Sequence, residues 1–232
     1  MSRTVAIHQP NFFPWLGYFA KIARADVFVF LDGVDYPKSG KSMGSYSNRV
    51  KLDIGGEARW WGCPVVRESG PQPIREVFIR KEPWREKVLK TLEQNYSRAS
   101  RFAELIDEVR GMVGLEEERV GAYNIANVRR VCELLGLSCE FVLQSEVEAP
   151  GHSTELLVNV VRAVGGSTYL SGTGGAKEYQ DESMFAAAGV ELLYSPFRPE
   201  PYERGGAPFL PGLSVLDALL HLGPEGTRAL LL

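Results

Sequence analysis

The chain has 232 residues, a formal net charge of −3, 44% hydrophobic residues and 24% charged residues. These values are ordinary for a globular protein with a full hydrophobic core, so they exclude the disordered and fibrous classes. A dedicated nucleic-acid binder usually carries a basic surface, and this sequence has no run of Lys or Arg that would supply one.

The segment 7–32 holds the densest group of informative residues. Residues 4–7 are an apolar strand candidate, residues 16–24 have helical spacing, and residues 27–31 are an unbroken apolar run. Such a run is typical of a parallel strand covered on both faces. Pro10 and Pro14 stiffen the polar loop after the first strand. We therefore expect a strand, loop, helix and strand, with His8 and Asp32 at the carboxyl ends of the two strands.

The middle of the chain predicts a loop, a hairpin and a block of helices. The Gly-, Ser- and Lys-rich segment 33–52 is typical of an active-site loop. Two apolar runs around the turn 54–57 predict a hairpin, because Gly55 and Gly56 allow positive φ. Residues 74–79 are a strand candidate. Helices are predicted from residue 83 to about 96, over 102–112 and over 116–135, with Gly136 as the stop.

The last third returns to alternating strands and helices. Strands are expected at 139–143, 167–170 and 190–194, and helices at 155–164, 181–188 and 213–222. Ser153 or Thr154 would cap the first of these helices. The alternation predicts an α/β fold with a mostly parallel, Rossmann-like sheet. We expect one domain over residues 1–232, with a helical insertion at about 83–135.

Several blocks of the sequence resemble the WbqC-like family. They are residues 8–11 (HQPN), 14–19 (PWLGYF), 25–29 (ADVFV) with Asp32, 48–50 (NRV), 169–172 (YLSG) with 174–175 (GG) and Tyr179, 211–217 (PGLSVLD) and 221–223 (HLG). The resemblance covers nearly the whole chain. It implies a bacterial protein that works in the assembly of surface polysaccharides such as O-antigen, or of related glycans and secondary metabolites.

A second similarity concerns nucleotidyltransferase-like α/β proteins. Residues 14–18 stand where those proteins carry a proline followed by a His-x-Gly-His signature. Trp15 and Tyr18 replace the two signature histidines, which stabilise the transferring phosphate. The similarity therefore implies a related fold and leaves the nucleotidyl-transfer activity without its catalytic groups.

His8 and Asp32 are the candidate catalytic residues. An imidazole with an ordinary pKa near 6.5 at the end of a strand can take a proton from an amine or hydroxyl group. The alternative is that His8 only shapes the loop through backbone hydrogen bonds. Asp32 is expected to orient His8, to bind a ribose hydroxyl or to act as a base, and the alternative for Asp32 is a turn residue before Gly33.

Substrate-binding candidates come from three other parts of the chain. Asn48 and Arg49 offer groups that hold a phosphate or carboxylate, although a surface ion pair would also explain Arg49. The glycine-rich loop 171–177 would wrap an anion with backbone N–H groups, or would be a plain turn. The full set of substrate-binding candidates is Gln9, Asn11, Tyr18, Asn48, Arg49, Ser171, Gly172, Gly174, Lys177, Asp217 and His221.

No metal site is predicted. Asp217 and His221 share one face of a helix, but no third ligand besides His8 has suitable spacing. Cys63, Cys132 and Cys139 match neither a zinc motif nor a redox pair, so reduced thiols are expected.

The function predicted from these residues and from the family resemblance is a transferase. It would move an acyl or aminoacyl group to an amino group of an activated sugar or similar metabolite. The alternatives are a degenerate nucleotidyltransferase-like enzyme that still uses a nucleotide, and a non-catalytic scaffold of a glycan-assembly complex.

We expect a cytoplasmic protein, because no secretory signal and no apolar run of 18 residues is present. The candidate partners are a small-molecule substrate, in particular a nucleotide-linked sugar, an acyl carrier protein and a second copy of the chain, and nucleic acid is not among them. No resident cofactor is identified, and a nucleotide or a carrier-bound donor is the candidate co-reactant.

Overall fold

The chain forms two compact units in the computed structural model, which describes residues 2–37, 45–173 and 180–232. Unit 1 consists of Met1–Gln9, Gly17–Gly33 and Leu137–Arg198, and unit 2 consists of Pro10–Leu16, Val34–Gly136 and Pro199–Leu232. The helices of the predicted insertion near 83–135 all belong to unit 2. The single domain over residues 1–232 stays a prediction.

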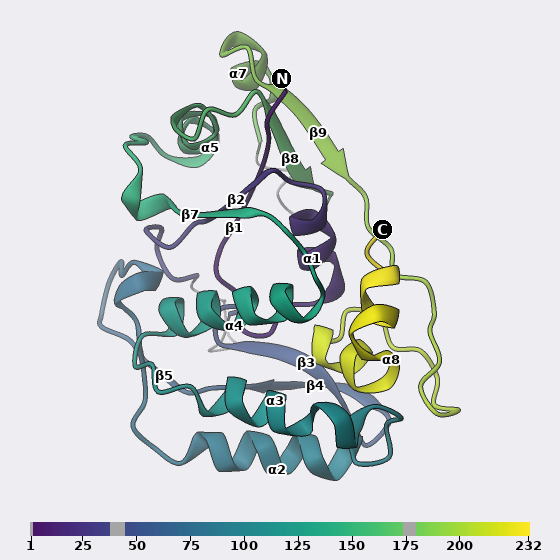
Figure 1. Cartoon of the computed structure of the whole chain (residues 1–232). Helices are drawn as coiled ribbons and strands as arrows, with labels where there is room; N and C mark the ends of the chain where they lie inside the picture. The colour runs from purple at the N-terminus through teal and green to yellow at the C-terminus, as the bar shows by residue number, and fades with distance from the viewer. Residues whose placement is uncertain (1, 38–44, 174–179) are drawn as a thin grey trace. The chain divides into compact units, whose positions relative to one another are not determined.

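Unit 1 is built around a parallel sheet (Figure 1). Its five described strands lie in the order β7-β2-β1-β8-β9, and every neighbouring pair is parallel. The strands are β1 (Thr4–His8), β2 (Val27–Phe30), β7 (Glu140–Leu143), β8 (Thr168–Gly172) and β9 (Glu191–Ser195). In order of appearance along the chain this arrangement reads 3-2-1-4-5, as in doubly wound folds. The predicted α/β class with a parallel Rossmann-like sheet is confirmed.

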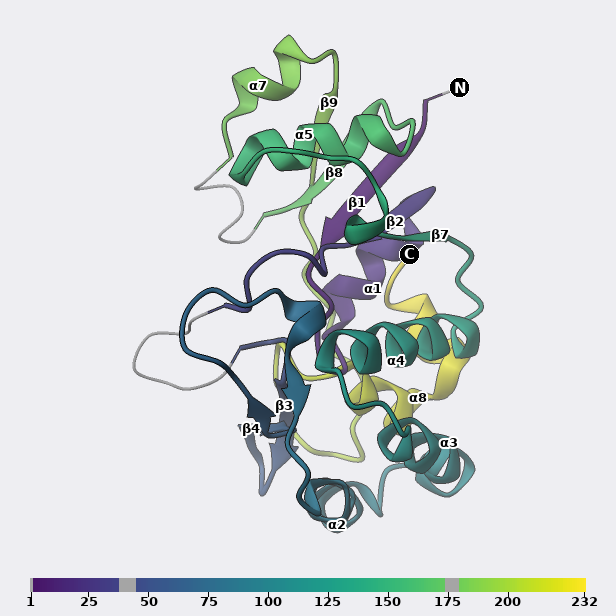
Figure 2. The same cartoon turned by 90° about the vertical axis from the view of Figure 1, so that its left-hand side faces the viewer.

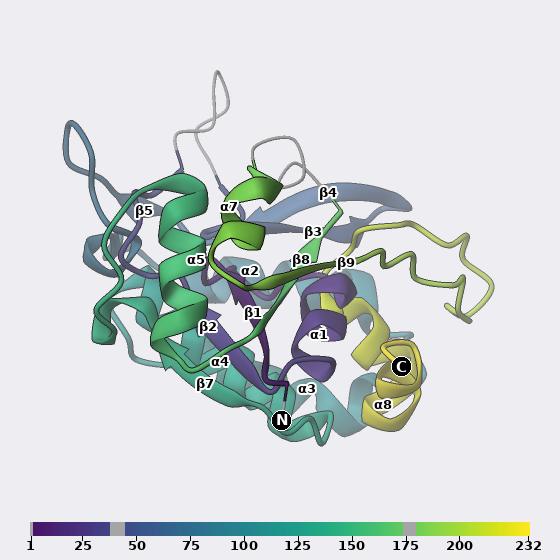
Figure 3. The same ribbon diagram turned by 90° about the horizontal axis from the view of Figure 1, so that it is seen from above.

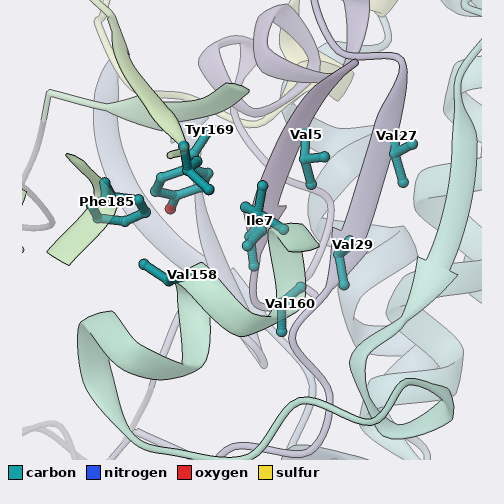
Figure 4. Close-up of a cluster of buried hydrophobic side chains, with 10 residues drawn as sticks. Val5, Ile7, Val27, Val29, Val158, Val160, Tyr169 and Phe185 are labelled. Atoms are coloured by element: carbon teal, nitrogen blue, oxygen red, sulfur yellow. The ribbon is translucent and has the colours of Figure 1, made fainter. Parts of the chain in front are cut away.

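Helices cover both faces of the sheet. Side chains alternate along a strand, so Val5 and Ile7 of β1 share one face. That face packs against α5 (Ser153–Ala163) and α7 (Glu182–Ala187) in a buried apolar cluster (Figure 4). Helices α5 and α7 lie side by side (Figure 3). Helix α1 (Leu16–Ala23) covers the opposite face, where the rings of Tyr18 and Phe28 are 5.2 Å apart.

Unit 2 contains the predicted hairpin. Strands β3 (Arg49–Ile54) and β4 (Glu57–Gly62) pair antiparallel around a turn in which Gly55 and Gly56 have φ of 67° and 84°. Gly62 is required at the other end of the hairpin, because a Cβ there would lie 2.1 Å from the carbonyl oxygen of Asn48. Two short strands, β5 (Val65–Val66) and β6 (Phe78–Ile79), form a second antiparallel pair.

The remaining described elements of unit 2 are mostly helical. They are η1 (Ile74–Glu76), α2 (Trp84–Tyr96), α3 (Phe102–Gly114), α4 (Val120–Leu134) and α8 (Val215–Ala229). Helices α2 and α3 lie side by side and are seen nearly end-on in Figure 2. The core of unit 2 contains an aromatic cluster made of Phe12, Phe13, Trp61, Trp84 and Tyr123. In the described part of the chain, no helix has the length and apolar character needed to cross a membrane.

Two predicted elements of unit 2 differ from the structure. The strand predicted over 74–79 is a 3-10 turn, η1, followed by the two-residue strand β6, because the N–H of Val77 donates back to the carbonyl of Ile74. The helix predicted from residue 116 begins only at Val120. Its expected first turn is extended, since the carbonyl of Glu118 accepts the N–H of Ile79 from β6.

Two helix ends also differ. Neither Ser153 nor Thr154 caps α5. The N-cap is His152 without a side-chain bond, and the hydroxyl of Thr154 instead accepts the N–H of Asp181. Helix α8 continues past the predicted end at residue 222 through a kink at Gly223. The φ of Gly223 is 75°, a left-handed value that glycine adopts at little cost, and Pro224 then restarts the helix.

Candidate functional site

In the sheet of unit 1, the order in which the chain adds strands reverses between β1 and β8. The chain builds β2 and β7 on one side of β1, and β8 and β9 on the other. Pairing between β1 and β8 ends at Ala6 and Leu170, whereas β1 stays paired with β2 up to His8, and β8 stays paired with β9 up to Gly172. We call these unpaired carboxyl ends the switch point. Open α/β sheets bind their ligands at this position.

The carbonyl oxygen of Gln9 orients the imidazole of His8 at the switch point. It lies 3.1 Å from Nδ1 of His8 and also accepts the hydroxyl of Tyr18 at 3.0 Å. A carbonyl oxygen only accepts hydrogen bonds, so Nδ1 carries the proton and Nε2 of the neutral ring keeps its lone pair. The ring of Tyr18 packs edge-on against the imidazole, with 4.8 Å between the centroids.

Lys21 completes this cluster. Its side chain is buried, and Nζ donates to the carbonyl of Ile7 at 3.0 Å. Burial lowers the pKa of Lys21 to about 8. Burial and the nearby Lys21 charge lower the pKa of His8 to about 3, and the hydrogen bond to Gln9 offsets only part of this shift. The imidazole is therefore neutral at physiological pH, beside a buried cation.

The end of β8 supplies the second side of the switch point. Ser171 is fully buried, and its hydroxyl is hydrogen-bonded to the side chain of Gln180 at 3.1 Å. A Cβ placed on Gly172 would meet no described atom within 4 Å. The structure thus brings the predicted residues Ser171 and Gly172 to the same sheet edge as His8. Gly174 and Lys177 lie outside the described residues.

Asp32 has another partner than the one expected. Its carboxylate accepts the backbone N–H of Ser145 at 3.0 Å and the hydroxyl of Ser145 at 2.7 Å. The N–H of Gly33 donates to the side chain of Gln144. The bonds of Asp32 and Gly33 therefore connect η2 (Gln144–Glu146) to the segment that follows β2. The described hydrogen bonds include none between Asp32 and His8. The geometry assigns the orientation of His8 to the Gln9 carbonyl.

In unit 2, Asn48 holds a loop. Its Oδ1 accepts the Tyr36 hydroxyl at 2.6 Å and the Ser45 N–H at 2.9 Å, and its Nδ2 donates to the Cys63 carbonyl at 2.9 Å. The side-chain amide of Asn48 is therefore bonded to the Tyr36 hydroxyl and to two backbone groups beside the β3–β4 hairpin. Asn11 is also buried, and it likewise belongs to unit 2.

Arg49 lies beside a cavity of about 730 Å³ in unit 2. Its guanidinium stands 4.3 Å above the centroid of the Trp60 ring. The cavity is bounded by the hairpin and by the start of α2, and the side chains of Trp60, Trp84 and Lys87 are part of its wall. Arg49 therefore borders this cavity, and its role in holding a phosphate or carboxylate stays a prediction.

Asp217 is the centre of a buried ionic network. It is fully buried, and its two oxygens accept Nε and Nη2 of Arg204 at 3.0 and 2.7 Å. Nη2 of Arg204 also donates to Asp53 of β3 at 2.7 Å. The hydroxyls of Tyr96 and Tyr202 donate to Asp217 at 2.8 and 2.5 Å. All of these bonds lie inside unit 2. Through them Asp217 connects α8 with α2, β3 and the segment around residue 204.

His221 is near this network but does not join it. Its ring centroid is 5.9 Å from that of Tyr96, and burial is the main cause that lowers its pKa. Among the residues described, no group of three or more His, Cys, Asp or Glu side chains could hold a metal ion. The cysteines Cys63, Cys132 and Cys139 are free thiols.

A family model described as the WbqC-like protein family matches residues 9–229. The chain belongs to the WbqC-like family. It is also similar to the "Uncharacterized protein Rv1507c" of Mycobacterium tuberculosis, with 31% identity over 229 residues that cover 96% of this chain and 95% of the relative. No solved structure matches the chain significantly.

Sequence reasoning missed two buried cations of this WbqC-like protein, Lys21 and Arg204. Lys21 is the only charged residue in the apolar helix α1, and that isolation was a usable signal for a buried cation. Arg204 lies in a proline-rich segment without periodicity, and no local pattern connects it to Asp53 or Asp217.

The Lys21→Met substitution tests the electrostatic coupling in the WbqC-like site. Removing the cation takes away one cause of the low His8 pKa, so this pKa should rise above about 3 and stay below 6.5, since burial persists. The measurement is an NMR titration of the His8 ring. Arg162→Met, which removes an exposed cation from α5, should leave the His8 pKa unchanged. An unchanged His8 pKa in Lys21→Met would contradict the coupling.

The Arg204→Met substitution tests whether the Asp217 network is structural. It would leave Asp217 and Asp53 without their buried cation, and breaking such a pair typically costs about 3–5 kcal/mol of unfolding free energy. Urea denaturation would measure the loss. Arg59→Met breaks the exposed pair with Glu57 and should cost less than about 1 kcal/mol. Equal small losses in both variants would argue against a structural role.

Proposed function

We propose that this WbqC-like protein is a transferase of bacterial surface-polysaccharide or related glycan biosynthesis. It moves an acyl or aminoacyl group from an activated donor to an amino group of an activated sugar or similar small metabolite. The observation that carries the proposal is the neutral His8 imidazole at the switch point, with Nδ1 bound to Gln9 and a lone pair on Nε2.

The proposed step needs one base. The acceptor nitrogen attacks the donor carbonyl carbon, and Nε2 of His8 takes the proton that the nitrogen releases. The bond between the carbonyl carbon and the leaving group then breaks, and Nε2 passes the proton to the leaving group. Positioned acid–base groups typically contribute about 10²- to 10⁴-fold to such rates.

Lys21 makes the pKa of His8 depend on whether a substrate is bound. An imidazole with a pKa of about 3 accepts protons poorly, and the Lys21 charge contributes to that value. A phosphate or carboxylate of the substrate placed beside Lys21 would offset the charge and raise the His8 pKa toward 6.5. In this proposal His8 becomes an effective base only when an anionic substrate is bound. Ser171, Gly172 and the following loop with Lys177 would hold the same anion.

A second candidate function is a nucleotide-using enzyme of the nucleotidyltransferase-like type. The strand order 3-2-1-4-5 with a switch point beside β1 favours it, since such sheets often bind nucleotides there. The placement of Tyr18 disfavours nucleotidyl transfer, because its hydroxyl donates to the Gln9 carbonyl and its ring is buried. Acyl or aminoacyl transfer therefore remains the first proposal.

The His8→Gln substitution tests the proposed function. Purified protein would be incubated with acyl thioester donors and nucleotide-linked amino sugars, and amide products would be detected by mass spectrometry. His8→Gln keeps a polar side chain but no base, so product formation should fall at least about 100-fold. His152→Gln, an exposed change at the start of α5, should keep full activity.

Two results would contradict this function. One is wild-type activity in His8→Gln. The other is the absence of any amide product from the wild-type protein across the whole donor and acceptor panel.

A further inference from the structure

The cavity of unit 2 has the size and position of a small-molecule site. Its volume of about 730 Å³ is within the range of about 300–1,000 Å³ that is usual for ligand pockets. Strands β3 and β4 form one side and the first two turns of α2 form the other, and the two elements lie together in Figure 2. All of its lining residues belong to unit 2.

Trp60 differs from the other indoles of this wall. Trp61 and Trp84 are each only 4% exposed, and the Trp61 indole N–H donates to the carbonyl of Val88 at 3.0 Å. Trp60 is 44% exposed. A large aromatic side chain that borders a cavity and is held open to solvent is suited to stacking on a planar ligand.

Two cations lie over the exposed indole, and a third lines the same cavity. The guanidinium of Arg49 stands 4.3 Å from the centroid of the Trp60 ring, and Nζ of Lys51 is 5.5 Å from it. Lys51 is paired directly with Trp60 across the hairpin, so the strand register places both cations on the indole side. Lys87 adds a third cation from α2, and Glu82 is the one acidic residue among the lining residues of the described cavity.

The start of α2 adds hydrogen-bond donors to the same wall. The N-cap residue, Pro83, makes no side-chain bond to the first turn of this 13-residue helix. Uncapped N–H groups and the helix dipole favour an anion at such an end. The indole N–H of Trp84 is buried and has no hydrogen-bond partner among the described atoms. The cavity therefore combines an aromatic surface with two lining cations, Arg49 and Lys87, and with the start of a helix.

We propose that this cavity binds a nucleoside phosphate, with its base stacked on Trp60 and its phosphates held by Arg49 and Lys87 at the start of α2. An acyl chain would offer no hydrogen-bond acceptor to the cations of the wall. A nucleic acid is disfavoured by the net charge of −3. This site is independent of the His8 chemistry, and it would serve a nucleotide-linked substrate or a nucleotide regulator equally.

Isothermal titration calorimetry with uridine diphosphate, adenosine diphosphate, uridine and inorganic pyrophosphate tests the proposal. At least one of the two nucleoside diphosphates should bind to the full chain more tightly than either uridine or inorganic pyrophosphate does. Trp60→Leu should weaken that binding about 10- to 100-fold through lost stacking, and Trp60→Phe should restore part of the affinity. Arg49→Gln should weaken diphosphate binding and have less effect on uridine.

The matched control is Arg59→Gln. Arg59 is the neighbour of Trp60 on β4, pairs with Glu57 and is not a lining residue, so its loss should leave the affinity unchanged. Equal binding of pyrophosphate and nucleotide, unaffected by Trp60→Leu, would overturn the nucleotide assignment. If neither uridine diphosphate nor adenosine diphosphate binds, the proposed site itself is overturned. Because calorimetry measures binding without turnover, neither result bears on His8 as a base.

Discussion

The carbonyl of Gln9 is the interaction on which the candidate active site depends. It accepts one hydrogen bond from Tyr18 and faces Nδ1 of His8 at 3.1 Å. The carbonyl of Ile7, two residues earlier, accepts a hydrogen bond from the buried ammonium of Lys21. Two backbone acceptors at the end of the central strand β1 thus set the tautomer of the imidazole and the position of the cation that lowers its pKa. Pairing with β2 continues up to His8, so the sheet holds the Ile7 carbonyl and positions Gln9 directly after the strand.

The acidic residues play a different part. Asp32 and Asp217 accept hydrogen bonds from Ser145 in unit 1 and from Arg204 and two tyrosines in unit 2. Buried carboxylates need such partners, since an unpaired buried charge is strongly destabilising. The described hydrogen bonds therefore give both buried carboxylates a structural explanation. The unprotonated Nε2 of His8 and the aromatic and cationic cavity wall are the two features on which the proposed functions rest.

Much of the fold was predictable, because local patterns are enough to define it. The apolar runs of β1 and β2 and the glycines at 55 and 56 correctly predicted two sheet strands and a hairpin. Errors arose where a distant partner decides the local structure. Residues before Val120 are extended because the carbonyl of Glu118 accepts the N–H of Ile79, and sequence periodicity contains no information on that bond.

The candidate site was predictable only in part, for the same reason. The strand ends carrying His8, Ser171 and Gly172 follow from the alternation of elements. Their meeting depends on the strand order and on the pairing that stops at Ala6 and Leu170. Asp217 and His221 do share a helix, but the buried Asp217 carboxylate is bonded to Arg204, which is 13 residues away in the chain. Ionic networks of this kind are set by tertiary packing and leave no local signature.

The tautomer of His8 is the most direct test of the account. Nitrogen-15 NMR of the histidine rings at pH 7, with His8 identified from the His8→Gln variant, distinguishes a protonated Nδ1 from a protonated Nε2. The structure predicts a neutral ring with the proton on Nδ1 and a bare Nε2. A proton on Nε2, or an imidazolium at this pH, would contradict the Gln9 hydrogen bond and the role of His8 as a base.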